Sequence, residues 1–477
     1  MKKILLGITL IVLGITLMAV FSSCKDYLNE EPELKQSNEL TFSKFESLNN
    51  AGAALYGMFQ SDAWYDGEFI LQGEMRSGNA KNPLSIPGSG RYRQDAAWNY
   101  TASVTSPLWS YAYYTIARAC NVINNLEGKA TGDVSQKDVD NLKAEALFIR
   151  ALCHFDLVIT YAQPYTSQPN SLGVPVVLVT ENGSPARNTV AEVYDQVVAD
   201  LTEAESLMSE DFSRPDATDQ KAVVSKAAIQ ALLSRVYLYM GQWQKAADYA
   251  TKVINNKKYS LAKGDDYAAM YKAAVGNSFG EIILEVYGSK KNEYWDNSGW
   301  QHLPYITSAE GSGDVCATSD LVDLYEDGDI RADLFYKNEN DNFTSKYSGK
   351  AGAVPYETNV PIIRLSEMYL NRAEAIINGA TISGVTAESD LKAIADARGA
   401  TAPSPSKVTI LQERRKELAF EGHYIYDLAR TGTGVTRSDY DATEANRNIP
   451  FPDKRWAMPI PKREMDANPN MVQNEGF

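Results

Sequence analysis

Histidine is scarce in this chain, and the short motifs that mark common enzyme classes are missing. The 477 residues include three histidines, His154, His302 and His423, far apart in the sequence. No Walker loop, dinucleotide-binding glycine fingerprint, HExxH zinc motif or GxSxG nucleophile motif occurs. The segment starting at Asp323 fails as a calcium loop, because Tyr325 occupies its third position and Leu334 its twelfth. The sequence therefore predicts no cofactor, no metal site and no catalytic residue.

Positive charge and cysteine are also in short supply. Lysine and arginine total 46 against 61 aspartates and glutamates, a formal net charge of −15. Such a charge repels nucleic acid phosphates, which excludes DNA and RNA as partners. Three cysteines lie well inside the chain, Cys120, Cys153 and Cys316, and an odd number cannot complete a disulfide framework. Cys120 and Cys153 fall on apolar helical stripes, so we expect buried thiols, although a bridge between them stays open.

Only the first residues contain a long apolar run. Two lysines precede an apolar stretch at 4–21, and two serines then lead to Cys24. This order is typical of a secretory signal; the alternative is a permanent membrane helix, because about eighteen apolar residues just span a bilayer. The small pair before Cys24 resembles a bacterial lipoprotein box, which implies removal of residues 1–23 and acylation of the Cys24 thiol. The acidic residues within 26–33 would then form a solvated tether.

Helical periodicity dominates the remaining chain. Apolar residues recur at three- and four-residue spacing over 109–123, 142–157, 193–208, 224–240, 362–376 and 411–425. Thr189 and Glu192 form a capping-box pattern before one of these stripes. The segment 227–254 predicts two helices joined at Gly241, with small residues at their crossing, as in a tetratricopeptide hairpin. We therefore predict a mostly α fold, a tetratricopeptide-like scaffold of about four degenerate helix pairs with long irregular loops and little β-structure.

Two long regions, 62–108 and 260–360, lack sustained periodicity, as does a shorter loop at 431–460. The second region contains a probable strand at 281–287. Long irregular stretches in folded proteins are usually functional or disordered, and the aromatic content here argues against disorder.

Each long region combines aromatic rings with amides, carboxylates and guanidinium groups. Flat rings offer an apolar face to a sugar, and the polar groups can satisfy its hydroxyls. This combination predicts a carbohydrate site, for which the candidate ligand-binding residues are Arg76, Asn79, Trp98, Tyr294, Trp295 and Trp300. The structural alternative is that the loop rings fill the interior of a helical core.

Six blocks in a fixed order resemble the SusD/RagB family of surface glycan-binding lipoproteins. They lie at residues 24–33, 108–126, 142–165, 360–376, 413–432 and 468–477. Departures are small: His423 stands where the family usually has arginine, and Ala162 where glycine is common. From the residues themselves, Arg414, Glu421 and Asp427 are expected to form a fold-maintaining network. We also expect helix-neighbour charge pairs Glu413–Lys416, Arg414–Glu417 and Arg364–Glu367.

The resemblance implies a non-enzymatic binder, lipid-anchored at Cys24 and exposed on the cell outer membrane. Such a protein binds an oligosaccharide and delivers it to a SusC-like TonB-dependent transporter. It also implies three parts: a signal peptide (1–23), a SusD-like N-terminal region (24–220) and a SusD/RagB C-terminal region (221–477), the last two forming one compact body. Two alternatives stay open: a glycoside hydrolase, since many carboxylates are present, or a transporter-associated adaptor or peptide-binding lipoprotein.

Overall fold

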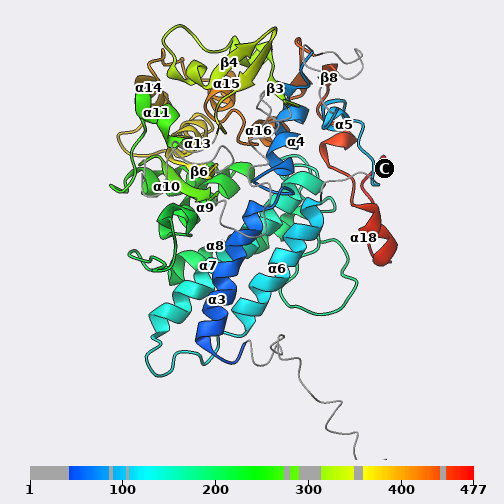
Figure 1. Ribbon diagram of the computed structural model, residues 1–477, viewed down its shortest axis with the longest axis vertical. Coiled ribbons are helices and arrows are strands. Elements are labelled where there is room, and N and C mark those ends of the chain that lie inside the picture. Colours follow the sequence, from blue (N-terminus) through cyan, green and yellow to red (C-terminus); the bar gives the residue numbers. More distant parts are fainter. Residues whose placement is uncertain are drawn as a thin grey trace, which may run out of the picture.

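The protein is described by a computed structural model (Figure 1). The structure describes residues 42–84, 90–103, 107–272, 280–288, 313–348, 358–440 and 447–477. The predicted signal peptide and Cys24 lie outside these ranges. Among the helices of these ranges, none is both long enough and apolar enough to cross a membrane.

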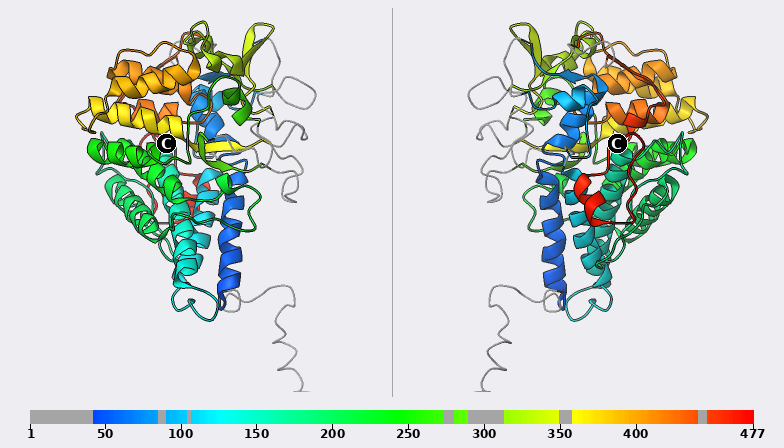
Figure 2. Two further views of the ribbon diagram at one scale, coloured as in Figure 1. Left: turned by 90° about the vertical axis from the view of Figure 1, so that its left-hand side faces the viewer. Right: turned by 90° about the vertical axis from the view of Figure 1, so that its right-hand side faces the viewer.

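The chain folds mainly into α-helices that contact one another in sequence order. The array comprises α6 (Leu108–Asn124), α7 (Gln136–Tyr161), α8 (Val190–Leu207), α9 (Lys226–Tyr239), α10 (Trp243–Ile254), α13 (Leu365–Ile377) and α14 (Ala387–Arg398), each packed on the next. In Figure 2 the green α9 and α10, the yellow α13 and the orange helices lie in successive layers. The predicted mostly α, tetratricopeptide-like fold is confirmed.

Local sequence signals explain where several of these helices begin. The predicted capping box before α8 is present, because Thr189 accepts from the backbone N–H of Glu192 and Glu192 accepts from that of Thr189. Ser135 caps α7 in the same way. Gly241 joins α9 to α10 with a φ of 69°, a left-handed conformation that glycine adopts without a steric cost. The predicted hairpin at 227–254 is therefore confirmed.

Helix α7 is buried on nearly all sides instead of along one stripe. It contacts α6, α8 and α3 (Phe45–Tyr56), and most of its residues between Val139 and Tyr161 are buried. Polar side chains on it are paired inside the protein: Arg150 binds Asp200 of α8 at 2.7 Å, and Glu145 binds Arg214 at 2.8 Å. The three internal cysteines are free and buried, so the bridge between Cys120 and Cys153 does not form.

The two regions without periodicity meet through short antiparallel strands. The first contains α4 (Glu68–Ser77), β1 (Ala80–Lys81) and α5 (Arg93–Ala96). The second contains α11 (Asp265–Met270), β2 (Ile282–Val286), β3 (Cys316–Ala317), α12 (Ser319–Val322), β4 (Phe335–Asn338) and β5 (Asp341–Thr344), and β6 (Val360–Arg364) begins at its last residue. A four-stranded sheet has the order β1-β3-β5-β4, with Ala80 opposite Ala317. Strand β2, predicted at 281–287, pairs with β6.

The last third of the chain closes the scaffold. Helices α15 (Lys407–Glu417) and α16 (Tyr424–Thr431) are followed by the strands β7 (Val435–Thr436) and β8 (Asn448–Ile449) and the short helices η5 (Lys454–Trp456) and α18 (Lys462–Ala467). α18 lies beside α6 in Figure 1, and Trp109 of α6 donates to Glu464 at 3.3 Å. One large apolar core includes residues from Leu48 to Met471, so segments from both halves of the chain contribute to it.

Candidate functional site

Two of the predicted ligand residues, Arg76 and Trp98, contact each other and are buried, with exposed fractions of 2% and 3%. The Arg76 guanidinium lies 5.0 Å from the Trp98 ring centroid and 5.4 Å from that of Tyr100. Trp98 Nε1 donates to the Arg76 carbonyl at 3.0 Å, and Arg76 Nη2 donates to the Trp456 carbonyl at 3.0 Å. The cation–π contacts and these hydrogen bonds fix the guanidinium behind η5.

Asn79 is also buried, at the turn that follows α4. Gly78 makes this turn with a φ of 83°. Asn79 Nδ2 donates to Glu74 Oε2 at 2.9 Å, and its Oδ1 accepts from Arg415 Nε at 2.8 Å. Burial raises the pKa of Glu74. Asn79 therefore connects α4 to α15 through its side chain.

The remaining candidates, Tyr294, Trp295 and Trp300, lie outside the described residues. Within the first aromatic cluster, Trp64 and Tyr65 are buried, and both donate to Asp156 Oδ2 at 2.8 Å. Trp64, Tyr65 and Trp98 therefore follow the structural alternative, in which the loop rings fill the core. Burial of a large ring is favourable once its polar tip has a hydrogen-bond partner. Ligand contact at the six candidate residues stays a prediction.

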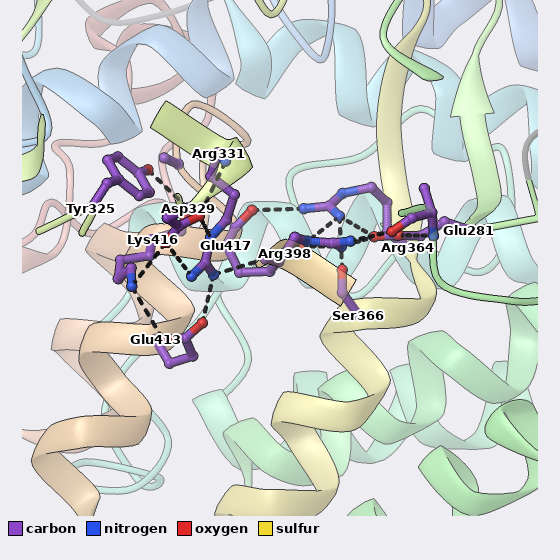
Figure 3. A network of polar contacts seen from close by, with 12 residues as sticks. Glu281, Tyr325, Asp329, Arg331, Arg364, Ser366, Arg398, Glu413, Lys416 and Glu417 are labelled. Carbon is purple, nitrogen blue, oxygen red and sulfur yellow. Dashed lines mark hydrogen bonds and ion pairs between the residues drawn. The ribbon is translucent and has the colours of Figure 1, made fainter. Parts of the chain in front are cut away.

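A buried ion network occupies the centre of the C-terminal half (Figure 3). Arg398 Nη2 lies 2.7 Å from both Glu281 Oε1 and Glu417 Oε1, and Arg364 Nη1 lies 2.6 Å from Glu281 Oε1. Arg331 Nη1 lies 3.1 Å from Glu417 Oε2, and Arg364 Nη1 lies 3.0 Å from Glu417 Oε1. Three guanidinium groups thus surround Glu417, and these charges hold the pKa of Glu417 well below its usual value despite its burial.

The fold-maintaining contacts predicted for Arg414, Glu421 and Asp427 are confirmed. Arg414 Nε donates to Asp427 Oδ2 at 2.9 Å, and Glu421 accepts from Arg364 and Lys346. Because burial disfavours the charged form while these cations favour it more strongly, the pKa of Glu421 and that of Asp427 are lowered to about 2.

Two of the predicted helix-neighbour pairs are wrong. Glu367 binds Arg235 of α9 at 2.7 Å instead of Arg364, and Glu417 binds the three arginines of the network instead of Arg414. Only Glu413–Lys416 occurs, at 3.8 Å. Sequence spacing identifies pairs on one exposed helix face, whereas these side chains are buried and reach other elements.

A polar edge lies where the two irregular regions pair. Asn82 Nδ2 donates to the Arg91 carbonyl at 2.9 Å and to the Asp314 carbonyl at 3.0 Å. The Arg91 side chain is 48% exposed and lies 3.6 Å from Asp314 Oδ2. No sequence motif marks Asn82 or Asp314, and only the β1–β3 pairing brings them together. No group of three or more histidine, cysteine, aspartate or glutamate side chains in the described residues is placed to hold a metal ion.

A polar cleft of about 730 Å³ opens beside the last residues of the chain. One wall is the segment after α7, the second is the turn leading into η5, and the third is the C-terminal segment. Leu172, Pro452 and Ala457 give it apolar surface, and its polar lining comprises Gln163, Gln168, Ser171, Asp453, Lys454, Gln473, Asn474 and Glu475. We call this the C-terminal cleft.

The walls of the C-terminal cleft are joined by side-chain amides. Gln163 Nε2 donates to the Lys454 carbonyl at 3.2 Å, and Asn474 Nδ2 donates to the carbonyls of Tyr161 and Met458 at 2.8 and 2.7 Å. Gln473 exchanges two hydrogen bonds with the Ile460 backbone, at 2.7 and 2.8 Å. The cleft is thus held open by groups from three separate stretches of chain.

Arg76 and Trp98 support this cleft from behind. The Trp98 and Trp456 rings meet edge to face at 5.0 Å, and the Tyr100 hydroxyl donates to the Arg455 carbonyl. Both contacts fall on the residues of η5, whose preceding turn lines the cleft. The lining residues could not be predicted from the sequence, because they lie on three loops that are far apart in the chain and share no motif.

The chain is similar to known proteins over nearly its whole length. Residues 26–238 match a family model described as "Starch-binding associating with outer membrane", and residues 336–477 match one described as "SusD family". A SusD-like protein P2 of Formosa agariphila is 25% identical, over 98% of both chains. The starch-binding protein SusD of Bacteroides thetaiotaomicron is 22% identical, over 80% of each chain.

The fold is likewise similar to solved structures. A SusD superfamily protein from Bacteroides thetaiotaomicron superposes with a TM-score of 0.79 and 29% sequence identity, covering 90% of this chain and 99% of that one. The similarity therefore includes the helical array as well as the segments that surround it.

Proposed function

Because the chain belongs to the SusD family, we propose that it is a non-catalytic carbohydrate-binding lipoprotein of the outer membrane. It binds an oligosaccharide or polysaccharide at the cell surface and delivers it to a SusC-like TonB-dependent transporter. The observation that carries the proposal is the pair of family matches at both ends of the chain, one of them to a family described as starch-binding and associated with the outer membrane.

The location rests on the N-terminal sequence together with the family. Cys24 follows two serines and an apolar run, and a lipid on its thiol would hold the folded body at the membrane. Replacement of Cys24 by alanine should release the protein from the membrane fraction, and metabolic labelling with a palmitate analogue should disappear. Retention of the label in Cys24→Ala would contradict the anchor.

The proposed ligand residues fall into two groups with different roles. Tyr294, Trp295 and Trp300 supply rings and polar tips for direct contact with the sugar. Arg76, Asn79 and Trp98 are proposed ligand residues that also stabilise the fold, through their contacts to Trp456 and Arg415.

Direct binding measurements test this proposal. We expect the mature chain without its lipid to bind at least one polysaccharide of a starch, laminarin, xylan, mannan and pectin panel in affinity electrophoresis, without releasing reducing sugar. Trp300→Ala should weaken binding at an unchanged melting temperature, whereas Trp98→Ala should also lower the melting temperature because it removes a buried ring. Unchanged affinity in both variants would reject these ligand residues.

Three other results would reject the wider proposal. Turnover of a polysaccharide would favour a glycoside hydrolase. Failure to bind any glycan, together with co-purification of a transporter, would favour an adaptor, and selective binding of peptides would favour a peptide receptor.

A further inference from the structure

The C-terminal cleft has the size and chemistry of a ligand site. Its volume of about 730 Å³ falls within the range of roughly 300–1,000 Å³ typical of small-molecule sites. Arg76, Asn79 and Trp98, the predicted ligand residues that the structure describes, do not line it. Its lining mixes side-chain amides, a hydroxyl and carboxylates with small apolar patches, so it offers both acceptors and donors over a short distance.

Gln163 provides a specific sign that a hydrogen-bond donor belongs in this cleft. Its Nε2 is committed to the carbonyls of Asp453 and Lys454 at 3.4 and 3.2 Å, which fixes the orientation of the amide. Its Oε1 is buried and has no hydrogen-bond partner in the part of the chain that the structure describes. A buried acceptor without a donor is costly, and an incoming O–H group removes that cost.

The charges of the lining select against ionic ligands. Asp453 and Glu475 supply two carboxylates against the single ammonium of Lys454, so an anion meets net negative charge. Asp453 already accepts hydrogen bonds from Arg455 Nε at 3.0 Å and Nη2 at 2.8 Å. These hydrogen bonds are the main reason that the pKa of Asp453 is lowered. A cation therefore competes with Arg455 for one of the two carboxylates. A neutral ligand rich in hydroxyl groups meets no such opposition.

The cleft is also preorganised. Gly476 has a φ of 95°, and a Cβ at this position would lie 2.5 Å from Lys454 Cδ, so the lysine side chain lies against the backbone of the C-terminal segment. Behind the second wall, the edge-to-face pair of Trp98 and Trp456 leaves little room for collapse. A site whose walls are already fixed loses little conformational entropy when a ligand binds.

We propose that the C-terminal cleft is a second saccharide-binding site, lined by none of Arg76, Asn79 and Trp98, in which the amide of Gln163, whose Oε1 lacks a donor among the described residues, binds a sugar hydroxyl. Gln168 and Glu475, which are exposed on the lining, contact further hydroxyls, and Leu172 and Pro452 offer apolar surface to the C–H face of the ring. The proposal rests on the proposed function, because it takes the same class of ligand.

Hydrogen–deuterium exchange of the mature chain locates the site directly. The probes are soluble hexasaccharides of glucose, xylose and mannose at millimolar concentration. We expect at least one of them to slow exchange in peptides covering 163–172 and 452–457, with a midpoint that gives the affinity of the cleft. Protection confined to peptides that cover 289–312 would overturn the second site and leave the proposed function standing. Absence of both protection and binding for the hexasaccharides and for the polysaccharide panel would reject both.

Substitutions then separate binding in the cleft from a distant response. Gln163→Leu should raise the saccharide concentration at half-protection about 3- to 10-fold, the effect of one lost hydrogen bond. Because this change could also loosen the wall, the double variant Gln168→Ala with Glu475→Gln repeats the test at two exposed positions.

Glu127→Gln serves as the matched control, since Glu127 is exposed and does not line the cleft. It should leave the midpoint unchanged. An unchanged midpoint in the double variant, with the melting temperature preserved, would overturn the proposal.

Discussion

The guanidinium of Arg364 and the carboxylate of Glu421 form a two-pronged ion pair inside the protein. Nε lies 2.9 Å from Oε2 and Nη2 lies 2.9 Å from Oε1, and both side chains are buried. Arg364 belongs to the end of β6 and Glu421 to the turn before α16, so the pair joins two elements that are not adjacent in the chain. Arg364 also contacts Glu281 and Glu417, which makes it central to the network of Figure 3.

Replacement of Arg364 should therefore be strongly destabilising. Arg364→Met removes the cation that Glu281, Glu417 and Glu421 share, and an uncompensated buried charge typically costs about 3–5 kcal/mol. The free energy of unfolding in urea measures this loss. Lys392→Met is the control, because the Lys392–Asp396 pair is exposed, and it should change stability by less than about 0.5 kcal/mol. Similar effects of the two changes would contradict this role for the network.

Acid should weaken the protein through Glu421 and Asp427. Their folded pKa values are lowered to about 2 from ordinary values of 4.5 and 3.8, so their contribution is fully present above these ordinary values and is lost as pH falls towards 2. Asp427→Asn removes one of the two groups. Urea unfolding of this variant should show a smaller loss of stability between about pH 4 and pH 2 than the wild type. If the unfolding free energies of the variant and the wild type fell in parallel with pH, Asp427 would not be a source of the acid sensitivity.

Asp156 should make the folded protein less stable as the pH rises, which is opposite to the effect of Glu421 and Asp427. Burial raises its folded pKa to about 7, although the donors Trp64 and Tyr65 favour its charged form. A raised folded pKa gives stability that is fully present below the ordinary value of 3.8 and is lost as pH rises through about 7.

Asp156→Asn tests this sign, because asparagine keeps the shape and an acceptor oxygen for both donors. The unfolding free energy of the variant should depend less on pH between about 4 and 7 than that of the wild type. Asp133 is exposed, so Asp133→Asn should leave the pH dependence of the unfolding free energy unchanged. A steeper slope in Asp156→Asn would contradict the assignment.

Gly78 should tolerate no side chain at the end of α4. It has a φ of 83°, and a Cβ would lie 2.6 Å from Arg437 Cγ. Gly78→Ala is therefore expected to lower stability by at least the cost of a left-handed residue, about 1–2 kcal/mol.

Gly57→Ala provides the contrast, since its φ is −62° and nothing lies within 4 Å of the added Cβ. It should be neutral or stabilise the protein by up to about 1 kcal/mol. Melting temperatures measure both changes, and an equal response would contradict the steric argument.

Much of the scaffold could be predicted because helix signals are local. The apolar spacing of 193–208, its capping residues Thr189 and Glu192, and the turn at Gly241 each depend on neighbours within a few residues. The same local rule failed for Arg364 and Glu367, whose partners lie on other elements of the fold. Local rules also left two readings open for Trp64 and Trp98, ligand contact or burial in the core, and the structure shows that both rings are buried.

The sequence by itself determined the helical class, the hairpin at 227–254, the family and the role of Arg414, Glu421 and Asp427 in holding the fold. Only the tertiary structure decided that Arg76, Asn79 and Trp98 are buried, and that Gln163, Asp453 and Glu475 line one cleft. The physical reason is the sequence separation of the interacting residues, because helical periodicity and capping act over a few residues only. Burial and cleft formation depend on contacts between segments about three hundred residues apart, such as Gln163 with Lys454.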